Sequence, residues 1–164
     1  MIRRIVLMRH AKSSWTSGAP TDHARPLNRR GRRAAPKVGA RLARLGWVPD
    51  RVVSSDAERT RETFARMREV LGYAGEATFT PDLYLAGVDE VRRVVAALPG
   101  EVRTVLLLGH NPGWEESLAW LSGRDEVMKT ASAALLSTEA DEWPAAVARP
   151  GGWRLDDLLH PREL

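Results

Sequence analysis

Short apolar runs recur along the chain of 164 residues, and longer polar or amphipathic stretches separate them. Apolar runs of this length with few charges are typical of strands that are buried on both faces of a sheet. The predicted strands cover residues 3–8, 51–55, 78–80, 104–108 and 133–138, and the segment 143–158 contains one more strand or an edge hairpin.

The stretches between the strands carry apolar residues at three- and four-residue spacing, which predicts helices with one buried face. Asn28 is expected to cap the first helix, which extends to about Leu45, and Pro36 implies either a kink or a late start. Asp56 is expected to cap the second helix. This second helix is predicted at 57–71, and the other helices at 88–98 and 114–121.

Strands and helices therefore alternate as β-α-β-α-β-α-β-α-β, and this order predicts a mainly parallel sheet with helices on both faces. The length suits one domain with a complete core, so we expect a single domain over residues 1–164. No apolar stretch reaches the roughly 18 residues that a membrane span needs. The apolar run near the N-terminus is too short for a signal peptide, so we expect a cytoplasmic protein.

The composition excludes several kinds of functional site. There is no cysteine, which excludes disulfides, thiolate metal sites and a cysteine nucleophile. The four histidines are His10, His23, His110 and His160, and no two of them have the close spacing of a metal-binding pair. We therefore expect no metal site.

Lysines and arginines outnumber acidic residues by 25 to 21, and the densest basic run is residues 29–33. Such a run can form a patch that binds nucleic acid or phosphate, and it can also be the solvated start of a helix. Surfaces that bind single-stranded nucleic acid place aromatic side chains among the basic ones, and this run has none. We therefore interpret the run as a solvated helix start and expect no nucleic-acid partner.

The residues that can carry chemistry follow strands. Arg9 and His10 come directly after the first strand, and His110 comes after the strand at 104–108. Ligands of open α/β sheets bind beyond the carboxyl ends of the strands, so these three side chains are aimed at one place. A neutral imidazole nitrogen can attack phosphorus when a backbone carbonyl holds the other ring nitrogen. An arginine fork binds phosphate oxygens, so the three residues together predict phosphoryl transfer.

A second cation is expected from the helix that follows the strand at 51–55. Arg59 falls in the first turn of this helix, where its guanidinium and the free backbone amides can both face an anion. Arg61 lies on roughly the opposite side of the helix, so only one of the two should enter the site. Gly109 permits a close approach of the backbone, and His110 can donate to a phosphoryl oxygen. Two arginines and two histidines can stabilise a transferring phosphoryl group without a metal.

The chain resembles the histidine phosphatase superfamily, whose signature is Arg-His-Gly near the N-terminus, and more narrowly the SixA-type phosphohistidine phosphatases. The segments that carry the resemblance are 7–15, 25–28, Gly31-Arg32, 55–63 and 109–113. The resemblance implies a three-layer α/β/α sandwich with a mostly parallel central sheet, which is the phosphoglycerate mutase-like fold. It also implies that neither a metal nor an organic cofactor is needed.

The same resemblance implies roles for individual residues. His10 would be the nucleophile, and Arg9, Arg59 and His110 would complete the phosphate pocket. The candidate substrate-binding residues are Ser13, Thr16 and Asn111.

Two departures from the superfamily pattern are present. Ala11 stands where the broader signature has glycine, as is common in SixA-like chains. Leu85 falls about where ester-cleaving members carry a Glu or Asp proton donor, and the placement of the nearby Asp82 and Asp89 is open. An alkoxide leaving group needs a proton, whereas a phosphorylated imidazole can leave as a neutral ring. The missing acid therefore favours a substrate with a nitrogen–phosphorus bond.

The short chain leaves little room for a lid, and an open site suits phosphohistidine on a protein, such as one of the histidine-containing phosphotransfer type. Trp15 and Trp114 either form an apolar rim for such a partner or are packing residues. The alternatives are a phosphatase or mutase for small phosphorylated molecules, and a module that binds phosphate without catalysis. We expect a monomer that does not associate with membranes.

Overall fold

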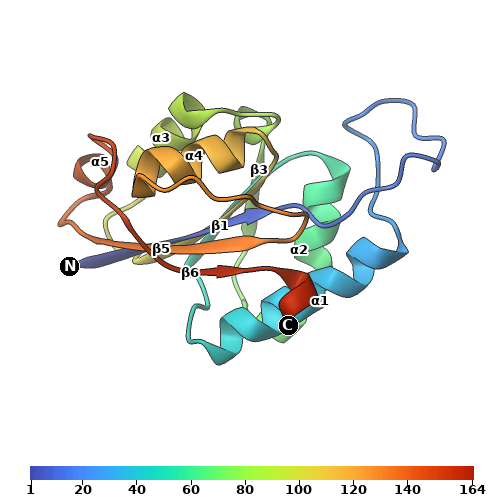
Figure 1. Ribbon diagram of the computed structural model, residues 1–164, viewed down its shortest axis with the longest axis horizontal. Coiled ribbons are helices and arrows are strands. Elements are labelled where there is room, and N and C mark those ends of the chain that lie inside the picture. Colours follow the sequence, from blue (N-terminus) through green and yellow to red (C-terminus); the bar gives the residue numbers. More distant parts are fainter.

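The computed structural model describes all 164 residues, and a six-stranded sheet forms its centre (Figure 1). The strands are β1 (Ile2–Arg9), β2 (Arg51–Ser55), β3 (Ala77–Thr80), β4 (Thr104–Gly109), β5 (Ala133–Glu139) and β6 (Arg154–Leu159). Their order across the sheet is β3-β2-β4-β1-β5-β6. All five predicted strands are present, and β6 is the additional strand expected within 143–158.

The four strands from β3 to β1 are parallel to one another, whereas β5 and β6 are antiparallel to their neighbours. The prediction of a mainly parallel sheet is therefore confirmed. The register of β1 on β4 pairs Arg9 with Gly109. The next residue of each strand, His10 or His110, therefore leaves the sheet at the same edge.

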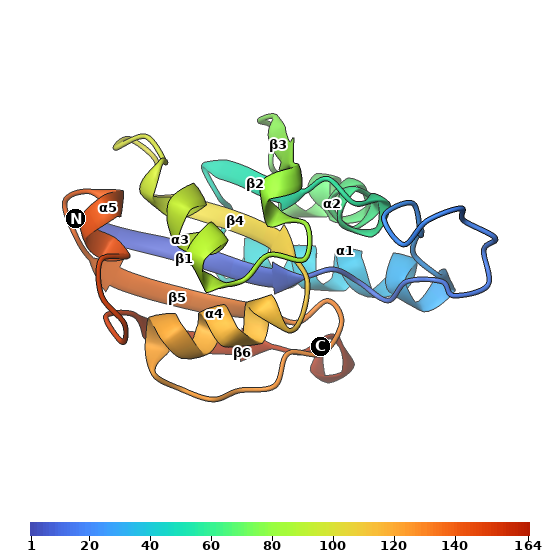
Figure 2. The same ribbon diagram turned by 90° about the horizontal axis from the view of Figure 1, so that it is seen from above.

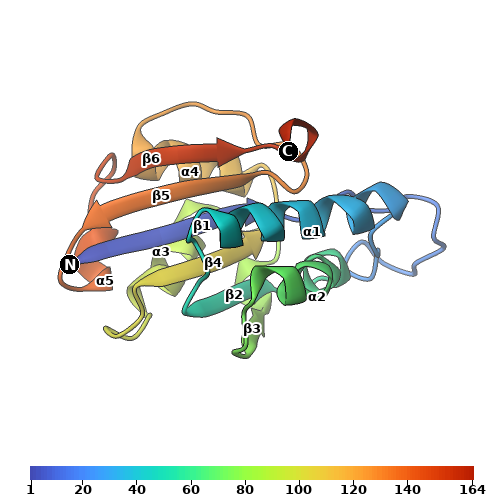
Figure 3. The ribbon, with the colours of Figure 1, turned by 90° about the horizontal axis from the view of Figure 1, so that it is seen from below.

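Helices cover both faces of the sheet, so the molecule has three layers (Figures 2 and 3). The helices α1 (Arg29–Arg44) and α2 (Glu58–Leu71) pack on one face, and α3 (Val88–Ala96), α4 (Gly113–Ser122) and α5 (Trp143–Ala146) pack on the other. This arrangement is the expected α/β/α sandwich. None of the helices combines the length and the apolar character that crossing a membrane requires.

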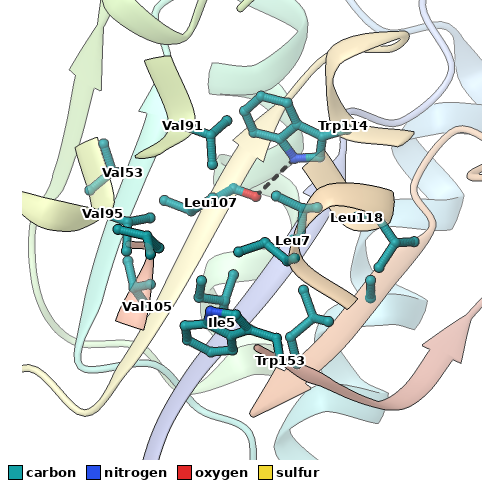
Figure 4. Packing of buried hydrophobic residues seen from close by; sticks show 14 of the residues in the cluster. Ile5, Leu7, Val53, Val91, Val95, Val105, Leu107, Trp114, Leu118 and Trp153 are labelled. Carbon is teal, nitrogen blue, oxygen red and sulfur yellow. Dashed lines mark hydrogen bonds between the residues drawn. The ribbon is translucent and has the colours of Figure 1, made fainter. Parts of the chain in front are cut away.

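The side chains of β1 alternate between the two cores, because successive residues of a strand point to opposite faces. Val6 and Met8 are buried in the core that includes α1 and α2, whereas Ile5 and Leu7 are buried in the core that includes α3 and α4. Figure 4 shows Ile5 and Leu7 in the second core, with Trp114 packed nearby. Because β1 is buried on both faces, its carboxyl end has a fixed position.

One local expectation is wrong, and one of the two alternatives for Pro36 is excluded. Asp56 does not cap α2, because its carboxylate accepts a hydrogen bond from His23 Nε2 at 2.8 Å and α2 has no side-chain cap. The first helix also does not start late. Asn28 Oδ1 caps it by accepting from the Gly31 N–H at 2.9 Å, as expected, and Pro36 lies inside the helix.

Candidate active site

Residues that follow β1, β2 and β4 line a cavity of about 330 Å³ at the carboxyl edge of the sheet, which we call the histidine cavity. Six of the seven predicted site residues line it, and Thr16 does not, because its side chain is exposed on the loop after β1. The complete lining is Arg9, His10, Lys12, Ser13, Trp15, Arg25, Arg59, Leu85, His110, Asn111 and Thr130.

Backbone hydrogen bonds on both sides hold His10 in place. Its N–H donates to the Gly109 carbonyl at 3.0 Å, and its carbonyl accepts from the Ala131 N–H at 2.9 Å. The ring nitrogen Nδ1 lies 2.6 Å from the Ala11 carbonyl oxygen. A carbonyl can only accept, so Nδ1 carries the proton and Nε2 keeps its lone pair. The buried ring therefore offers Nε2 as a nucleophile at the histidine cavity.

The surroundings keep His10 neutral. The pKa of His10 is lowered to about 3, first by burial and then by the positive charges of Arg59 and Arg9. The hydrogen bond to Ala11 opposes this shift, because it stabilises the protonated ring. The lone pair on Nε2 is therefore free at neutral pH, without any proton having to be removed from it first.

His110 faces His10, with 5.3 Å between the two ring centroids, and its ring also contacts a serine. Ser55 Oγ lies 2.8 Å from His110 Nε2 and already accepts a hydrogen bond from the Ala57 N–H at 3.2 Å. When the Ser55 hydroxyl donates its proton to Nε2, the ring proton of His110 lies on Nδ1. The pKa of His110 is lowered to about 3, chiefly by burial, so the ring is a neutral donor.

Asp22 accepts hydrogen bonds from two arginines, Arg25 and Arg59, on one side of the cavity. Arg59, only 3% exposed, donates to the Asp22 carbonyl at 2.9 Å and to Asp22 Oδ2 at 3.1 Å. Arg25 Nε donates to Asp22 Oδ1 at 3.1 Å, and the Tyr84 hydroxyl donates to Oδ2. The hydrogen bond from Tyr84, followed by those from the two arginines, holds the pKa of Asp22 well below its usual range. Asp22 is therefore a fixed carboxylate and not a proton donor.

Buried polar atoms without a partner gather around the histidine cavity. Five buried side-chain nitrogen or oxygen atoms in the protein have no hydrogen-bond partner, and four of them belong to residues that line this cavity. Two of the four are the N–H groups of Arg9 Nε and Arg59 Nε, and a third is His110 Nδ1, which is a donor when Ser55 donates to Nε2. Buried donors are normally satisfied, so a cluster of unpaired donors on cavity-lining residues indicates a site for an anion.

Two of the remaining candidate residues, Ser13 and Asn111, line the histidine cavity, and Arg61 does not. Ser13 is buried and its hydroxyl accepts from Arg25 Nη1 at 2.7 Å, whereas Asn111 Nδ2 donates to the Met128 carbonyl at 3.0 Å. Arg61 lies outside the cavity, where its Nε donates to the Asp56 carbonyl at 2.9 Å. Of Arg59 and Arg61, Arg59 is therefore the one that the fold brings to the histidines.

No carboxylic acid lines the histidine cavity. Leu85 lies in the lining with a positive φ of 51°, and its side chain occupies the position at which the sequence suggested a missing proton donor. Asp82 and Asp89 are both exposed and lie outside the lining. In addition, no three His, Asp or Glu side chains cluster closely enough to hold a metal ion.

The two tryptophans near the motifs, Trp15 and Trp114, differ in their exposure to solvent. Trp15 is 80% exposed at the edge of the cavity, and the Arg25 guanidinium carbon lies 3.6 Å from the centroid of its ring. Trp114 is fully buried and packs against Gly109, where a Cβ would come within 2.3 Å of the indole. The close approach that Gly109 permits is thus made by a core side chain, and Trp114 cannot form a rim.

Asp22, Tyr84 and Ser55 are parts of the site that the sequence did not single out. Asp22 lies in the long loop between β1 and α1, and Tyr84 follows the short 3-10 turn after β3. Neither position shows a periodicity that predicts where its side chain points. Ser55 was within a motif segment, but its contact with His110 depends on the pairing of β2 with β4.

Comparisons with known proteins agree with this geometry. The family model described as the histidine phosphatase superfamily (branch 1) matches residues 5–84. A chloroplastic protein of Arabidopsis thaliana, described as uncharacterised, is 39% identical over 97% of this chain and 78% of its own. A structure described as a candidate phosphohistidine phosphatase SixA from Nakamurella multipartitia is 32% identical, with a TM-score of 0.84 over 98% of this chain and 97% of its own. The chain belongs to the histidine phosphatase superfamily and is of the SixA type.

A second SixA structure, described as a candidate phosphohistidine phosphatase from Agrobacterium tumefaciens, is 28% identical. It has a TM-score of 0.82 and covers 97% of this chain and 98% of its own. As a SixA-type member of the superfamily, the chain is a phosphatase. Its central sheet and helices are those of the SixA fold over nearly their whole length.

Replacing Arg59 with glutamine should raise the pKa of His10, because the change removes a positive charge that lowers it. A pH titration of the imidazole nitrogens by ¹⁵N NMR measures this shift. Arg61→Gln removes the same charge two residues away on the outer side of α2, and it should leave the pKa of His10 near its wild-type value. Equal shifts in the two variants would contradict the assignment of Arg59 to the site.

Proposed function

We propose that this SixA-type phosphatase hydrolyses phosphohistidine carried by a protein, through a covalent intermediate on His10. One observation carries the proposal. A neutral imidazole, with its lone pair on Nε2, lines a cavity whose other buried side chains leave unpaired N–H donors. This is what an enzyme needs to attack a phosphoryl group and to bind its charged oxygens.

In the first step, His10 Nε2 attacks phosphorus in line with the nitrogen–phosphorus bond of the substrate. The new bond to Nε2 forms while the substrate bond breaks, and its electron pair passes to the departing ring nitrogen. A substrate imidazole that carries a proton on its other nitrogen then leaves as a neutral ring. Arg9, Arg59 and the Nδ1–H of His110 would bind the three equatorial oxygens, on which charge accumulates.

In the second step, water attacks phosphorus from the side that the product imidazole has left. The bond between phosphorus and Nε2 breaks, its electron pair returns to His10, and the proton of the water goes to the phosphate. The Ala11 carbonyl keeps the Nδ1 proton in place throughout, so the ring ends the cycle in the tautomer in which it began.

The absence of an acid supports a nitrogen–phosphorus substrate. Cleavage of an alkyl phosphate ester releases an alkoxide, which must be protonated as it departs. No Asp or Glu lines the cavity, and Asp22, the carboxylate in contact with Arg59, is held ionised. A phosphohistidine places no such demand on the protein, because its leaving group is neutral.

The enzyme should therefore hydrolyse a phosphohistidine peptide faster than alkyl or aryl phosphate esters. The measurement compares kcat/KM for the three substrates in buffer without added metal. His10→Ala should abolish turnover of all three while retaining the thermal unfolding midpoint of a folded protein. Faster turnover of alkyl esters than of phosphohistidine would overturn the proposed substrate class, and turnover by His10→Ala near the wild-type rate would overturn the mechanism.

Introducing a proton donor at Leu85 should increase the rate of ester hydrolysis relative to that of phosphohistidine hydrolysis. Well-placed general acids accelerate reactions by roughly 10²–10⁴-fold, so we expect Leu85→Glu to raise alkyl ester hydrolysis by about tenfold or more. Leu85→Gln is the matched control, since it has nearly the same shape and no proton to give. The ratio of ester to phosphohistidine turnover should increase in the first variant only. No difference between the two variants would contradict the argument from the missing acid.

A further inference from the structure

A second and larger cavity, of about 610 Å³, lies directly beside the histidine cavity, and we call it the basic groove. The two cavities share Arg9, Lys12 and Thr130 in their walls. The remaining cationic lining residues of the groove are Arg30, Arg33, Lys37, Lys129 and Arg162, with His160 beside them. A group bound in the groove is therefore next to whatever occupies the histidine cavity.

The lining of the groove carries positive charge and no carboxylate. Seven lysines and arginines line it, and no Asp or Glu does. None of the seven is in a salt bridge, although other arginines of the protein are. Like charges held around one hollow repel each other, and this cost is recovered when an anionic partner binds there.

The basic run of α1 contributes to the groove with one of its faces. Arg30, Arg33 and Lys37 follow one another at three- and four-residue spacing, so they share a side of the helix. Arg32 is on another side, where its Nε donates to Glu62 Oε2 at 2.8 Å. The four arginines of the run are exposed, as the sequence suggested, but two of them form a wall of the groove that the sequence alone did not indicate.

Segments far apart in the sequence complete the groove. Lys12 comes from the loop after β1, and Lys129 from the segment between α4 and β5. Arg162 comes from the 3-10 turn Pro161–Glu163, which lies against α1 near the C-terminus (Figures 1 and 3). Four separate parts of the chain thus place cations around one hollow that opens beside the proposed nucleophile.

We propose that the basic groove binds an acidic segment of the phosphoprotein substrate, close to its phosphohistidine. This inference rests on the proposed function. The groove contains more cations than one phosphate dianion can balance, and its long Lys and Arg side chains can adjust to several carboxylates. Its lining has no Phe, Tyr or Trp on which a nucleotide base could stack, which argues against nucleic acid. The groove would then select the partner, whereas the histidine cavity would select the phosphoryl group.

Two phosphohistidine peptides that differ only in their flanking residues test this directly. One carries Asp and Glu around the phosphohistidine, and the other carries Asn and Gln at the same positions. We expect the wild-type enzyme to prefer the acidic peptide by about tenfold or more in kcat/KM, mainly through KM, and to lose this preference as salt is raised. An aryl phosphate serves as a substrate too small to reach the groove.

Arg33→Glu/Lys37→Glu reverses two groove charges at exposed helix positions that do not line the histidine cavity. The double variant should lose the preference for the acidic peptide, and its kcat/KM for the neutral peptide and the aryl phosphate should stay near wild type. Arg103→Glu/Arg149→Glu makes the same change in net charge at exposed positions outside both cavities. This control variant should keep the preference, and its thermal midpoint should match that of the first.

The outcomes separate the two proposals. Efficient turnover of both peptides with no preference for the acidic one would overturn the groove assignment and leave the phosphohistidine activity standing. Failure to cleave either peptide would overturn the proposed function instead. Equal loss of preference in both double variants would show that net charge is responsible rather than the groove. Inhibition by tripolyphosphate or RNA that requires Arg33 and Lys37, without any peptide preference, would assign the groove to another polyanion.

Discussion

The parallel register that pairs Arg9 with Gly109 determines where the chemistry of this protein takes place. Because β1 and β4 are neighbours and end together, His10 and His110 leave the sheet side by side, with ring centroids 5.3 Å apart. The pairing of β2 with β4 then brings Ser55 to His110 and places the first turn of α2, with Arg59, at the same edge. A shift of one residue in this register would send the histidine rings to opposite faces of the sheet.

Burial and charge act together on the two rings. Burial disfavours an imidazolium, and the surrounding arginines disfavour it further, so both histidines remain neutral well below physiological pH. The same arginines would repel one another, and Asp22 offsets part of this repulsion on the side of Arg59 and Arg25. On the other side, the lining of the basic groove contains no carboxylate. The protein thus concentrates positive charge beside an uncharged nucleophile.

Local patterns made the strands, the helices and the histidine motifs predictable. Short apolar runs marked the four central strands. Residues that directly follow parallel strands must meet at one edge, which is why Arg9, His10 and His110 could be placed together. The choice of Arg59 over Arg61 followed from the place of Arg59 in the first turn of the helix and from helical periodicity. The expectation that Asp56 caps α2 was wrong, because the Asp56 carboxylate is hydrogen-bonded to His23, which is distant in the sequence.

Other features depend on contacts that no local pattern encodes. Asp22 contacts Arg59 from a loop, and the residues around Asp22 in the sequence do not predict that contact. Thr16 was expected among the substrate-binding residues, but it is exposed and does not line the histidine cavity. The basic run of α1 became a groove wall only through the loop after β1, the segment before β5 and the C-terminal turn. Function in this protein therefore combines a predictable centre with surroundings that only the fold reveals.

The most direct test of the account is to look for the covalent intermediate on His10. The enzyme is mixed with a phosphohistidine peptide, quenched within one turnover under alkaline conditions that preserve nitrogen–phosphorus bonds, and examined by peptide mass spectrometry and ³¹P NMR. The account predicts a phosphoryl group on His10, attached at Nε2, because the Ala11 carbonyl holds the proton on Nδ1. A phosphoryl group on another residue, or on Nδ1 of His10, would contradict it.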